Sequence, residues 1–291
     1  MRLRLRETTL ELEPGRPLLM GIVNAGPDSF SDPGLRSVEE LAERARSMAA
    51  DGAALIDVGG ESSRTDRPPV EEQEELERVA PVVESLAAAG LLVSVDTWRA
   101  PVARGALAAG AAMINDVSAL SDPGVARACA DAGAALVVTH TRVEPKAKGF
   151  PRYDDVVSDV AELLGDRSAA ARGLGVDREQ LVLDPGIDLG KTPAESVEVL
   201  RRLRELHELG RPLLLAVSRK DFLGALTERS PAERDAGTLA AVGAASEGGA
   251  HVLRVHDVAA AHDYLRVRAA LTGDEPLPEG PLPHGLRREP A

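Results

Sequence analysis

One group of polar side chains in this sequence has the composition of an anion-binding site. Its members lie where apolar runs end, and they combine an amide, two hydroxyls, two guanidiniums and an imidazole: Asn24, Ser62, Ser63, Arg64, Arg254 and His256. Arg offers paired donors that match phosphate oxygens. The amide oxygen of Asn24 suits Mg²⁺, which usually takes few protein ligands and completes its shell with water and phosphate. These residue types favour a phosphorylated substrate held together with a metal ion.

A second group has the composition of a site for a polar heterocycle. It consists of two carboxylates, an amide and an ammonium, from Asp96, Asn115, Asp184 and Lys220. Such a set can pair with ring N–H donors as well as with carbonyl or ring-nitrogen acceptors. Lys220 is one of only four lysines among 34 basic residues. Because arginine is the usual cation in this chain, a lysine at this position indicates that a compact charge is required there. A solvated surface lysine and a lysine that forms a Schiff base are the alternatives.

Alternating aliphatic runs and amphipathic segments must position these side chains. The sequence predicts eight strands, at 18–23, 54–58, 91–95, 112–114, 134–138, 181–183, 213–217 and 252–255. It predicts helices at 38–50, 71–89, 101–109, 125–132, 154–174, 194–209, 232–247 and 262–271. Strand–helix units in a row imply a parallel sheet with right-handed crossovers, and eight of them close a barrel. We therefore predict an α/β fold of the (β/α)8 TIM-barrel type, with an open doubly wound sheet as the alternative.

The active site of such a barrel lies at the carboxyl ends of its strands. Each of the eight predicted strands ends in a polar or charged residue. A single residue of this kind would be a cap or a turn residue. Eight of them on one rim indicate an enzyme.

Composition excludes several other classes of protein. The net charge of −13 argues against a nucleic-acid partner, because a phosphate backbone would be repelled. No apolar run is long enough to span a membrane. A single cysteine, Cys129, excludes a disulfide within the chain and fits a reducing compartment, so we predict a cytoplasmic protein.

The chain is predicted to form one domain with a short tail. Residues 1–272 would make up the barrel together with an N-terminal β-hairpin over its bottom, where Leu alternates with polar residues and Glu13–Arg16 form a turn. Residues 273–291 are rich in Pro and Gly and are predicted to be disordered.

Seven stretches, in order along the chain, resemble the motifs of the dihydropteroate synthase family of pterin-binding barrels. They lie between residues 18 and 257 and read MGIVNAGPDSFSDPG, IDVGGESSR, SVDTWR, INDVS, LDPGIDLGK, SRKDFLGAL and LRVHDV. The resemblance implies an enzyme that joins 6-hydroxymethyl-7,8-dihydropterin diphosphate to p-aminobenzoate and releases pyrophosphate. It also implies Mg²⁺ as the cofactor and a homodimer.

The resemblance assigns a role to each candidate residue. Catalysis would involve Asn24, Asp96, Lys220, Arg254 and His256, with Asn24 holding the metal. Substrate binding would involve Ser63, Arg64, Asp96, Asn115, Asp184, Lys220, Arg254 and His256. A first loop carrying Asp28, Phe30 and Asp32 would close over the diphosphate as a lid.

Several positions depart from the family pattern, and they cluster on the side of the amine substrate. Gly26, Thr65, Leu189 and Thr139 replace residues that the family commonly has there. The largest departure is Asp221, a carboxylate where a Ser commonly meets the p-aminobenzoate carboxylate. We expect Asp221 to turn away, pairing with Arg219 or capping the helix that begins near Phe222; alternatively, the true amine lacks the carboxylate.

Other functions fit parts of the pattern. A pterin-binding paralogue that uses another amine, a methyltetrahydrofolate-dependent methyltransferase and a non-catalytic pterin binder are the alternatives. The predicted anion-binding group, which includes Arg64, Arg254 and His256, favours the synthase, because the methyltransferases need no diphosphate group.

Overall fold

Parallel strands form the centre of this computed structural model, which describes residues 1–26, 37–61, 68–275, 277, 280 and 286. The strands are β3 (Leu18–Asn24), β4 (Ala53–Gly59), β5 (Val93–Asp96), β6 (Met113–Asp116), β7 (Ala135–Thr139), β8 (Leu181–Asp184), β9 (Leu214–Ala216) and β10 (Val252–Val255). Their order is β8-β7-β6-β5-β4-β3-β10-β9. The two ends of this order meet in a single parallel bridge between Leu183 and Leu213, so the sheet closes. The predicted barrel is confirmed, and the open sheet is wrong.

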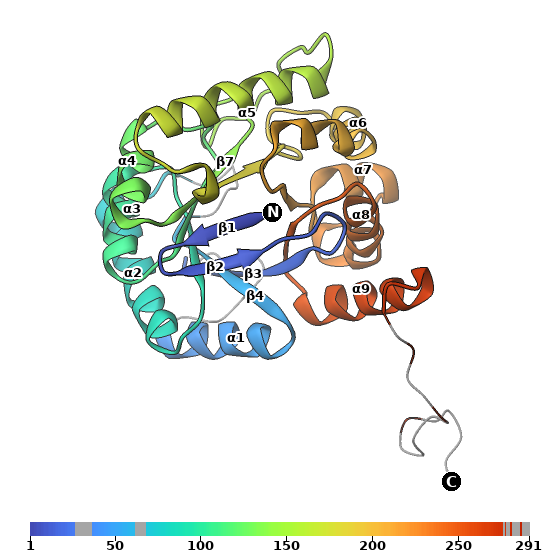
Figure 1. Cartoon of the computed structure of the whole chain (residues 1–291), viewed down its shortest axis with the longest axis horizontal. Helices are drawn as coiled ribbons and strands as arrows, with labels where there is room; N and C mark the ends of the chain where they lie inside the picture. The colour runs from blue at the N-terminus through green and yellow to red at the C-terminus, as the bar shows by residue number, and fades with distance from the viewer. Residues whose placement is uncertain (27–36, 62–67, 276, 278–279, 281–285, 287–291) are drawn as a thin grey trace.

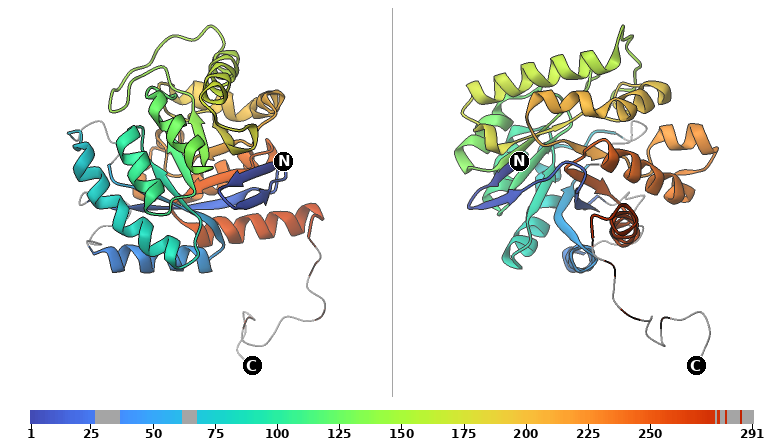
Figure 2. Two further views of the ribbon diagram at one scale, coloured as in Figure 1. Left: turned by 60° about the vertical axis from the view of Figure 1, so that its left-hand side comes forward. Right: turned by 45° about the vertical axis from the view of Figure 1, so that its right-hand side comes forward.

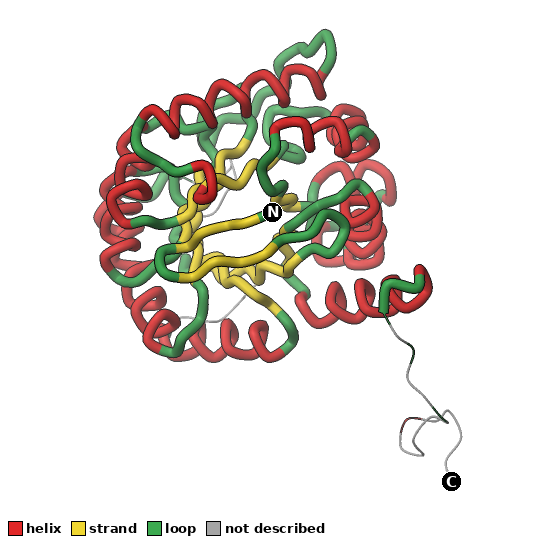
Figure 3. Tube along the Cα trace, in the orientation of Figure 1, coloured by secondary structure: helices red, strands yellow, loops and turns green. Residues whose placement is uncertain are grey.

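Helices surround the strands, as the red coils around the yellow centre of Figure 3 show. They are α1 (Val38–Ala50), α2 (Glu72–Ala88), α3 (Ala100–Ala108), α4 (Pro123–Ala132), α5 (Val156–Gly173), α6 (Pro193–Arg201), α7 (Asp221–Thr227), α8 (Asp235–Glu247) and α9 (Val258–Thr272). Short 3-10 turns lie at Arg178–Gln180, Leu203–Leu209 and Pro231–Glu233. The main core lies between the strands and this helical ring and is almost entirely aliphatic.

Three helices differ from the predicted ones. The predicted helix at 194–209 ends at Arg201, and a 3-10 segment follows that buries Leu203 and Leu206 on one side. The last helix begins at Val258 rather than at residue 262, because the Asp257 side chain caps it through the Ala260 N–H. Helix α7 begins at Asp221, one residue before the start expected near Phe222, and it is only seven residues long.

An N-terminal hairpin closes the bottom of the barrel, as predicted. Strands β1 (Arg2–Leu5) and β2 (Thr8–Glu11) pair antiparallel and lie across the barrel opening in Figure 1. In the two views of Figure 2 the hairpin stays at one end of the barrel. Leu3, Leu5 and Leu12 are fully buried against the residues that fill the barrel interior at this end.

The interior of the barrel changes from apolar to polar along the strands. Its lower layer holds Met20, Leu55, Met113, Val137, Val182, Leu214 and Val252 together with the hairpin leucines. Side chains two residues apart on a strand share a face. The next interior positions toward the carboxyl ends therefore include Asp57, Asn115, Thr139, Asp184 and Arg254. The hairpin and the apolar layer close one end, so this polar layer faces the other.

Most of the tail predicted at 273–291 lies outside the described residues. Helix α9 ends at Thr272, and Gly273 follows with a φ of 83°. In the described part of the chain, none of the helices has the length and apolarity required to cross a bilayer.

Candidate active site

Arg254 connects two carboxylates inside the barrel. Its Nε donates to Asp57 Oδ2 at 2.6 Å, and its Nη2 donates to Asp96 Oδ2 at 2.9 Å. Asn115 Nδ2 donates to the same Asp57 oxygen at 3.2 Å. Strand alternation on β4, β5, β6 and β10 brings these four side chains together. A predicted member of the anion-binding group, Arg254, thus lies with the carboxylates of the heterocycle group.

The pKa of Asp96 is raised to about 7 in this setting. Burial is the main cause, Arg254 opposes it, and the neighbouring carboxylates Asp57 and Glu75 add to it. Burial alone would lower the pKa of the Arg254 guanidinium, but Asp57 and Asp96 more than offset this and raise it. Asp96 is therefore able to exchange a proton near neutral pH, while Arg254 stays charged.

Several buried polar atoms in this layer have no partner among the described residues. They include Asp57 Oδ1, Asn115 Oδ1 and Thr139 Oγ1. Buried polar atoms are nearly always hydrogen-bonded, because leaving one unpaired costs about 1–3 kcal/mol. Two unpaired acceptors and a hydroxyl at interior positions of the barrel fit a ligand that carries N–H donors, as a heterocycle with amino groups does.

Asp184 lies at the end of β8, beside Thr139 across the ladder with β7. Its Oδ1 accepts the Gly186 N–H at 2.7 Å. Burial raises the Asp184 pKa, and the Gly186 N–H and the charge of Lys220 hold it down. Lys220 immediately precedes α7 and also lowers the pKa of Asp96. The structure thus brings together all four residues of the predicted heterocycle group.

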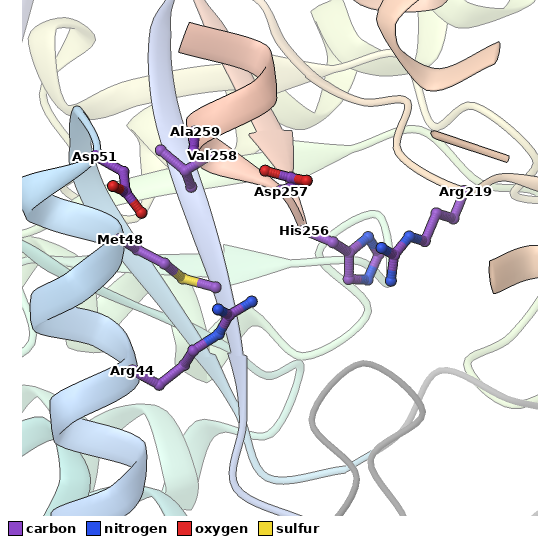
Figure 4. A pocket seen from close by; sticks show the side chains of 8 residues that line it. All are labelled: Arg44, Met48, Asp51, Arg219, His256, Asp257, Val258 and Ala259. Carbon is purple, nitrogen blue, oxygen red and sulfur yellow. The ribbon is translucent and has the colours of Figure 1, made fainter. Parts of the chain in front are cut away.

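His256 lies at the end of β10 beside a pocket of about 230 Å³ that Arg44, Arg219 and His256 line together with Met48 and Asp257. Figure 4 shows Arg44 projecting from α1 toward this space. The His256 pKa is lowered to about 3, mainly by burial and in addition by the charges of Arg254, Arg219, Lys220 and Arg44. The imidazole is therefore neutral at pH 7.

Ser218 orients the His256 ring. The His256 N–H donates to Ser218 Oγ at 3.3 Å, and this hydroxyl lies 2.9 Å from His256 Nδ1. The hydroxyl can donate to Nδ1 while it accepts the backbone N–H, and in that arrangement the ring proton lies on Nε2. Four cations near one neutral imidazole N–H donor form a region suited to a phosphate group.

Asn24 ends β3, and its side-chain oxygen lies over Gly59. A Cβ added at Gly59 would lie 3.6 Å from Asn24 Oδ1 and 3.9 Å from Asp96 Cβ, so the glycine leaves space beside the amide oxygen. No cluster of three or more His, Cys, Asp or Glu ligands is present in the described ranges. One neutral oxygen at the rim fits Mg²⁺, which keeps several water or phosphate ligands.

Asp221 does not pair with Arg219, in contrast to our expectation. Its carboxylate is 83% exposed and pairs with Arg234 at 3.1 Å, while Arg219 binds Asp235. Asp221 does not cap α7 either, because the Phe222 N–H donates to Asp188 Oδ2 at 3.2 Å. The Asp221 carboxylate is therefore solvated and balanced by a guanidinium.

Six predicted site residues lie outside the described residues: Asp28, Phe30, Asp32, Ser62, Ser63 and Arg64. Their assignments stay predictions.

Comparison with known proteins identifies the family. A sequence model described as pterin binding enzyme matches residues 20–256. The dihydropteroate synthase of Escherichia coli (strain K12) is 40% identical over 279 residues, which cover 94% of this chain and 98% of that protein. The chain belongs to the dihydropteroate synthase family.

Solved structures of dihydropteroate synthases share the fold and this length. The Xanthomonas albilineans enzyme with 4-aminobenzoic acid is 45% identical and has a TM-score of 0.86, covering 93% of this chain and 98% of that one. The same enzyme in complex with 7,8-dihydropteroate is 44% identical, with a TM-score of 0.83 and coverages of 94% and 99%. Dihydropteroate synthases are transferases, which confirms the prediction of a transferase. Membership of this family, rather than of a methyltransferase or Schiff-base family, disfavours those two alternatives.

Sequence reasoning missed one residue that the geometry places at the centre of this dihydropteroate synthase site. Asp57 is fully buried and accepts from both Arg254 and Asn115. A signal was present, because Asp57 interrupts the apolar run of β4 on the face that Leu55 shares. In the sequence Asp57 lies within the motif IDVGGESSR, which by itself assigns it no role.

Proposed function

We propose that this chain joins 6-hydroxymethyl-7,8-dihydropterin diphosphate to p-aminobenzoate and forms 7,8-dihydropteroate and pyrophosphate. The observation that carries the proposal is the polar layer in the barrel. There Asp57, Asn115 and Asp184 occupy interior positions of the barrel, and Asp57 Oδ1 and Asn115 Oδ1 are buried without a partner among the described residues, beside a cationic rim. A pterin presents amino and ring N–H groups on one edge and carries its diphosphate on the opposite side, so it matches both parts.

The pterin is oriented by the buried acceptors. Asp184 accepts from the ring edge, and its charge is maintained by Gly186 and Lys220. Asn115 provides a free oxygen from the neighbouring wall. An ionised Asp96 stabilises positive charge that develops on the ring when the bond from the methylene carbon to the diphosphate oxygen breaks.

The leaving group is stabilised at the rim. The His256 Nε2–H donates to a phosphate oxygen, and the surrounding cations offset its charge. The amine nitrogen of p-aminobenzoate then bonds to the methylene carbon and loses a proton to solvent. No covalent bond to the protein is required at any stage.

Mg²⁺ is part of this proposal, with Asn24 as its protein ligand. When bound, the metal would supply Lewis-acid stabilisation of the departing diphosphate. Asn24 suits this role because its oxygen lies at the rim, beside the space that Gly59 leaves open.

We also propose a cytoplasmic homodimer. Helices α7 and α9 expose Leu226, Val267 and Leu271, which are 67%, 59% and 83% exposed. Helix α8 contacts both α7 and α9, and apolar side chains exposed on helices of one side of the ring favour a self-complementary contact. Sedimentation velocity would measure the state of association.

Incubation of the protein with the pterin diphosphate, Mg²⁺ and p-aminobenzoate tests the proposed reaction. We expect 7,8-dihydropteroate, identified by its mass, and one equivalent of pyrophosphate. Two results would reject the proposed reaction: release of pyrophosphate without formation of a pterin–amine adduct, and no product from either substrate.

The Asp221→Ser variant is expected to lower the KM for p-aminobenzoate only modestly, by less than about tenfold. The exposed carboxylate already pairs with Arg234, and solvent screens its remaining charge. Steady-state kinetics with p-aminobenzoate as the varied substrate measure the effect, and Asp235→Ser, on the neighbouring ion pair with Arg219, is the control. A drop of a hundredfold or more from a poor starting value would mean that p-aminobenzoate is not the native amine.

A further inference from the structure

Lys191 is a fully enclosed lysine behind the site, and every proton of its ammonium group has an acceptor. It is 1% exposed. Its Nζ lies 2.7 Å from His140 Nδ1, 2.9 Å from the Gly186 carbonyl oxygen and 3.2 Å from the Leu189 carbonyl oxygen. An ammonium has three donors and no acceptor. The three contacts therefore occupy all three N–H donors of the ammonium, whereas a neutral amine has only two donors and would leave one of the acceptors unpaired.

His140 is held as the acceptor of this contact by Asp159 on α5. The His140 Nε2 lies 2.8 Å from Asp159 Oδ1, and Arg142 binds both oxygens of the same carboxylate at 3.0 Å. The His140 Nε2–H therefore donates a hydrogen bond to Asp159, and Nδ1 is left without a proton, so it can accept from Lys191. The chain of contacts extends from a partly exposed carboxylate to the buried ammonium.

The turn that Lys191 holds also carries the partner of Asp184. The Gly186 carbonyl oxygen accepts from Lys191 and also from the Leu189 N–H at 3.0 Å, while the Gly186 N–H donates to Asp184 Oδ1. A Cβ at Gly186 would lie 1.9 Å from the His140 carbonyl oxygen, and its φ is 68°, so only glycine fits there. The two peptide groups on either side of the Gly186 Cα are thus both held by hydrogen bonds, one through its N–H and the other through its carbonyl oxygen.

We propose that Lys191, held by His140 and Asp159, is a positioning residue for the substrate carboxylate Asp184, and that it acts only in its charged form. The proposal rests on the proposed function for the identity of the ligand. Asp184 needs the Gly186 N–H to stay ionised in a buried position, and Lys191 binds the carbonyl oxygen of the same glycine, so it holds the next peptide group of the turn. Nothing in the proposed reaction requires Lys191 to touch the substrate.

The charge of Lys191 depends on a balance that pH can change. Burial lowers its pKa to about 7, and Lys220 lowers it, whereas Asp184, Asp159 and Glu195 raise it. The contacting His140 is neutral, because burial lowers its pKa to about 4. The ammonium is present below the Lys191 pKa and is lost as the pH rises through it. Affinity for the pterin is therefore expected to fall on the alkaline side.

Two variants of the full chain test the proposal. Lys191→Met removes the donors at similar length, and we expect pterin diphosphate to bind about 10- to 100-fold more weakly at pH 6.5, by calorimetry without the amine. Hydrogen exchange of the 186–190 segment is expected to accelerate by at least about tenfold relative to intrinsic rates. Lys148→Met, at an exposed lysine, is the control and should match the wild type in both measurements.

Asp159→Asn keeps an oxygen acceptor for His140 and removes one charge that raises the Lys191 pKa. We expect the alkaline limb of pterin affinity to move to lower pH by about half a unit or more, with little change at pH 6. Titration of the pterin itself is identical for both proteins and cancels in the comparison.

The outcomes separate the two proposals. Wild-type affinity and exchange in Lys191→Met, or an unmoved alkaline limb in Asp159→Asn, would overturn the role of Lys191. If Lys191→Met does not fold, the Asp159→Asn profile decides alone. If the wild type binds no pterin diphosphate, the proposed function fails. Amide hydrogen exchange of the 186–190 segment, measured as a function of pH in the wild type and in Asp159→Asn, then still tests whether charged Lys191 holds the turn.

Discussion

Asn24→Ala is expected to lower the rate of the chemical step by about 10²–10³ while leaving pterin binding nearly intact. Asn24 lies at the rim, above Gly59, away from the acceptors that orient the ring. Its loss removes the protein ligand of Mg²⁺ from the departing diphosphate, an interaction that strengthens as charge develops. Single-turnover kinetics with Mg²⁺ measure the step, and calorimetry with the pterin measures binding.

Asn24→Asp is the matched control, because it keeps a hard oxygen at the same position. It should retain much more activity than Asn24→Ala at saturating Mg²⁺. Full turnover of the wild type in excess EDTA, or an unchanged rate for Asn24→Ala, would contradict the assignment of the metal and its ligand.

Arg254→Met is expected to reduce the free energy of unfolding by about 3–5 kcal/mol and to abolish measurable turnover. The substitution leaves Asp57, which is fully buried, without the guanidinium that it binds at 2.6 Å. It also removes the main charge that holds down the pKa of Asp96. Asp96 then becomes neutral at pH 7 and no longer stabilises positive charge on the pterin.

The defect in stability should depend on pH in a defined direction. Without Arg254 the pKa of Asp96 rises further, so ionising it in the folded state becomes more costly. The loss of stability is therefore full at alkaline pH and shrinks as the pH falls and Asp96 takes up a proton. Urea unfolding at pH 8 and pH 5.5 measures the difference.

A double variant separates stability from catalysis. Arg254→Met combined with Asp57→Asn removes the uncompensated charge and should recover much of the stability but none of the activity. Arg46→Met, on a solvated ion pair with Glu39, should change neither. Equal stability of Arg254→Met and wild type at pH 8 would show that the buried pair is not needed for the fold.

The barrel could be predicted from the sequence because its signals are local. Aliphatic runs such as 18–23 and 252–255 fall on β3 and β10, since strands of a parallel barrel are buried on both faces. The predicted helix at 38–50 matches α1, which the Ser37 side chain caps through the Glu40 N–H. The end of α6 at Arg201 and the 3-10 segment that follows it were not predictable in this way, because they depend on the burial of Leu203 and Leu206 by neighbouring elements.

The sequence by itself determined the fold class, the polar ends of the strands and, through seven ordered motifs, the family. Only the tertiary structure decided which polar side chains meet. Arg254 lies 197 positions from Asp57 and 158 from Asp96, and Lys191 lies 51 positions from His140. Motifs record residue types along the chain, whereas these contacts depend on which strands are neighbours and which face each residue occupies. Barrel closure fixes both, so a buried charge finds its partner only once the whole ring has formed.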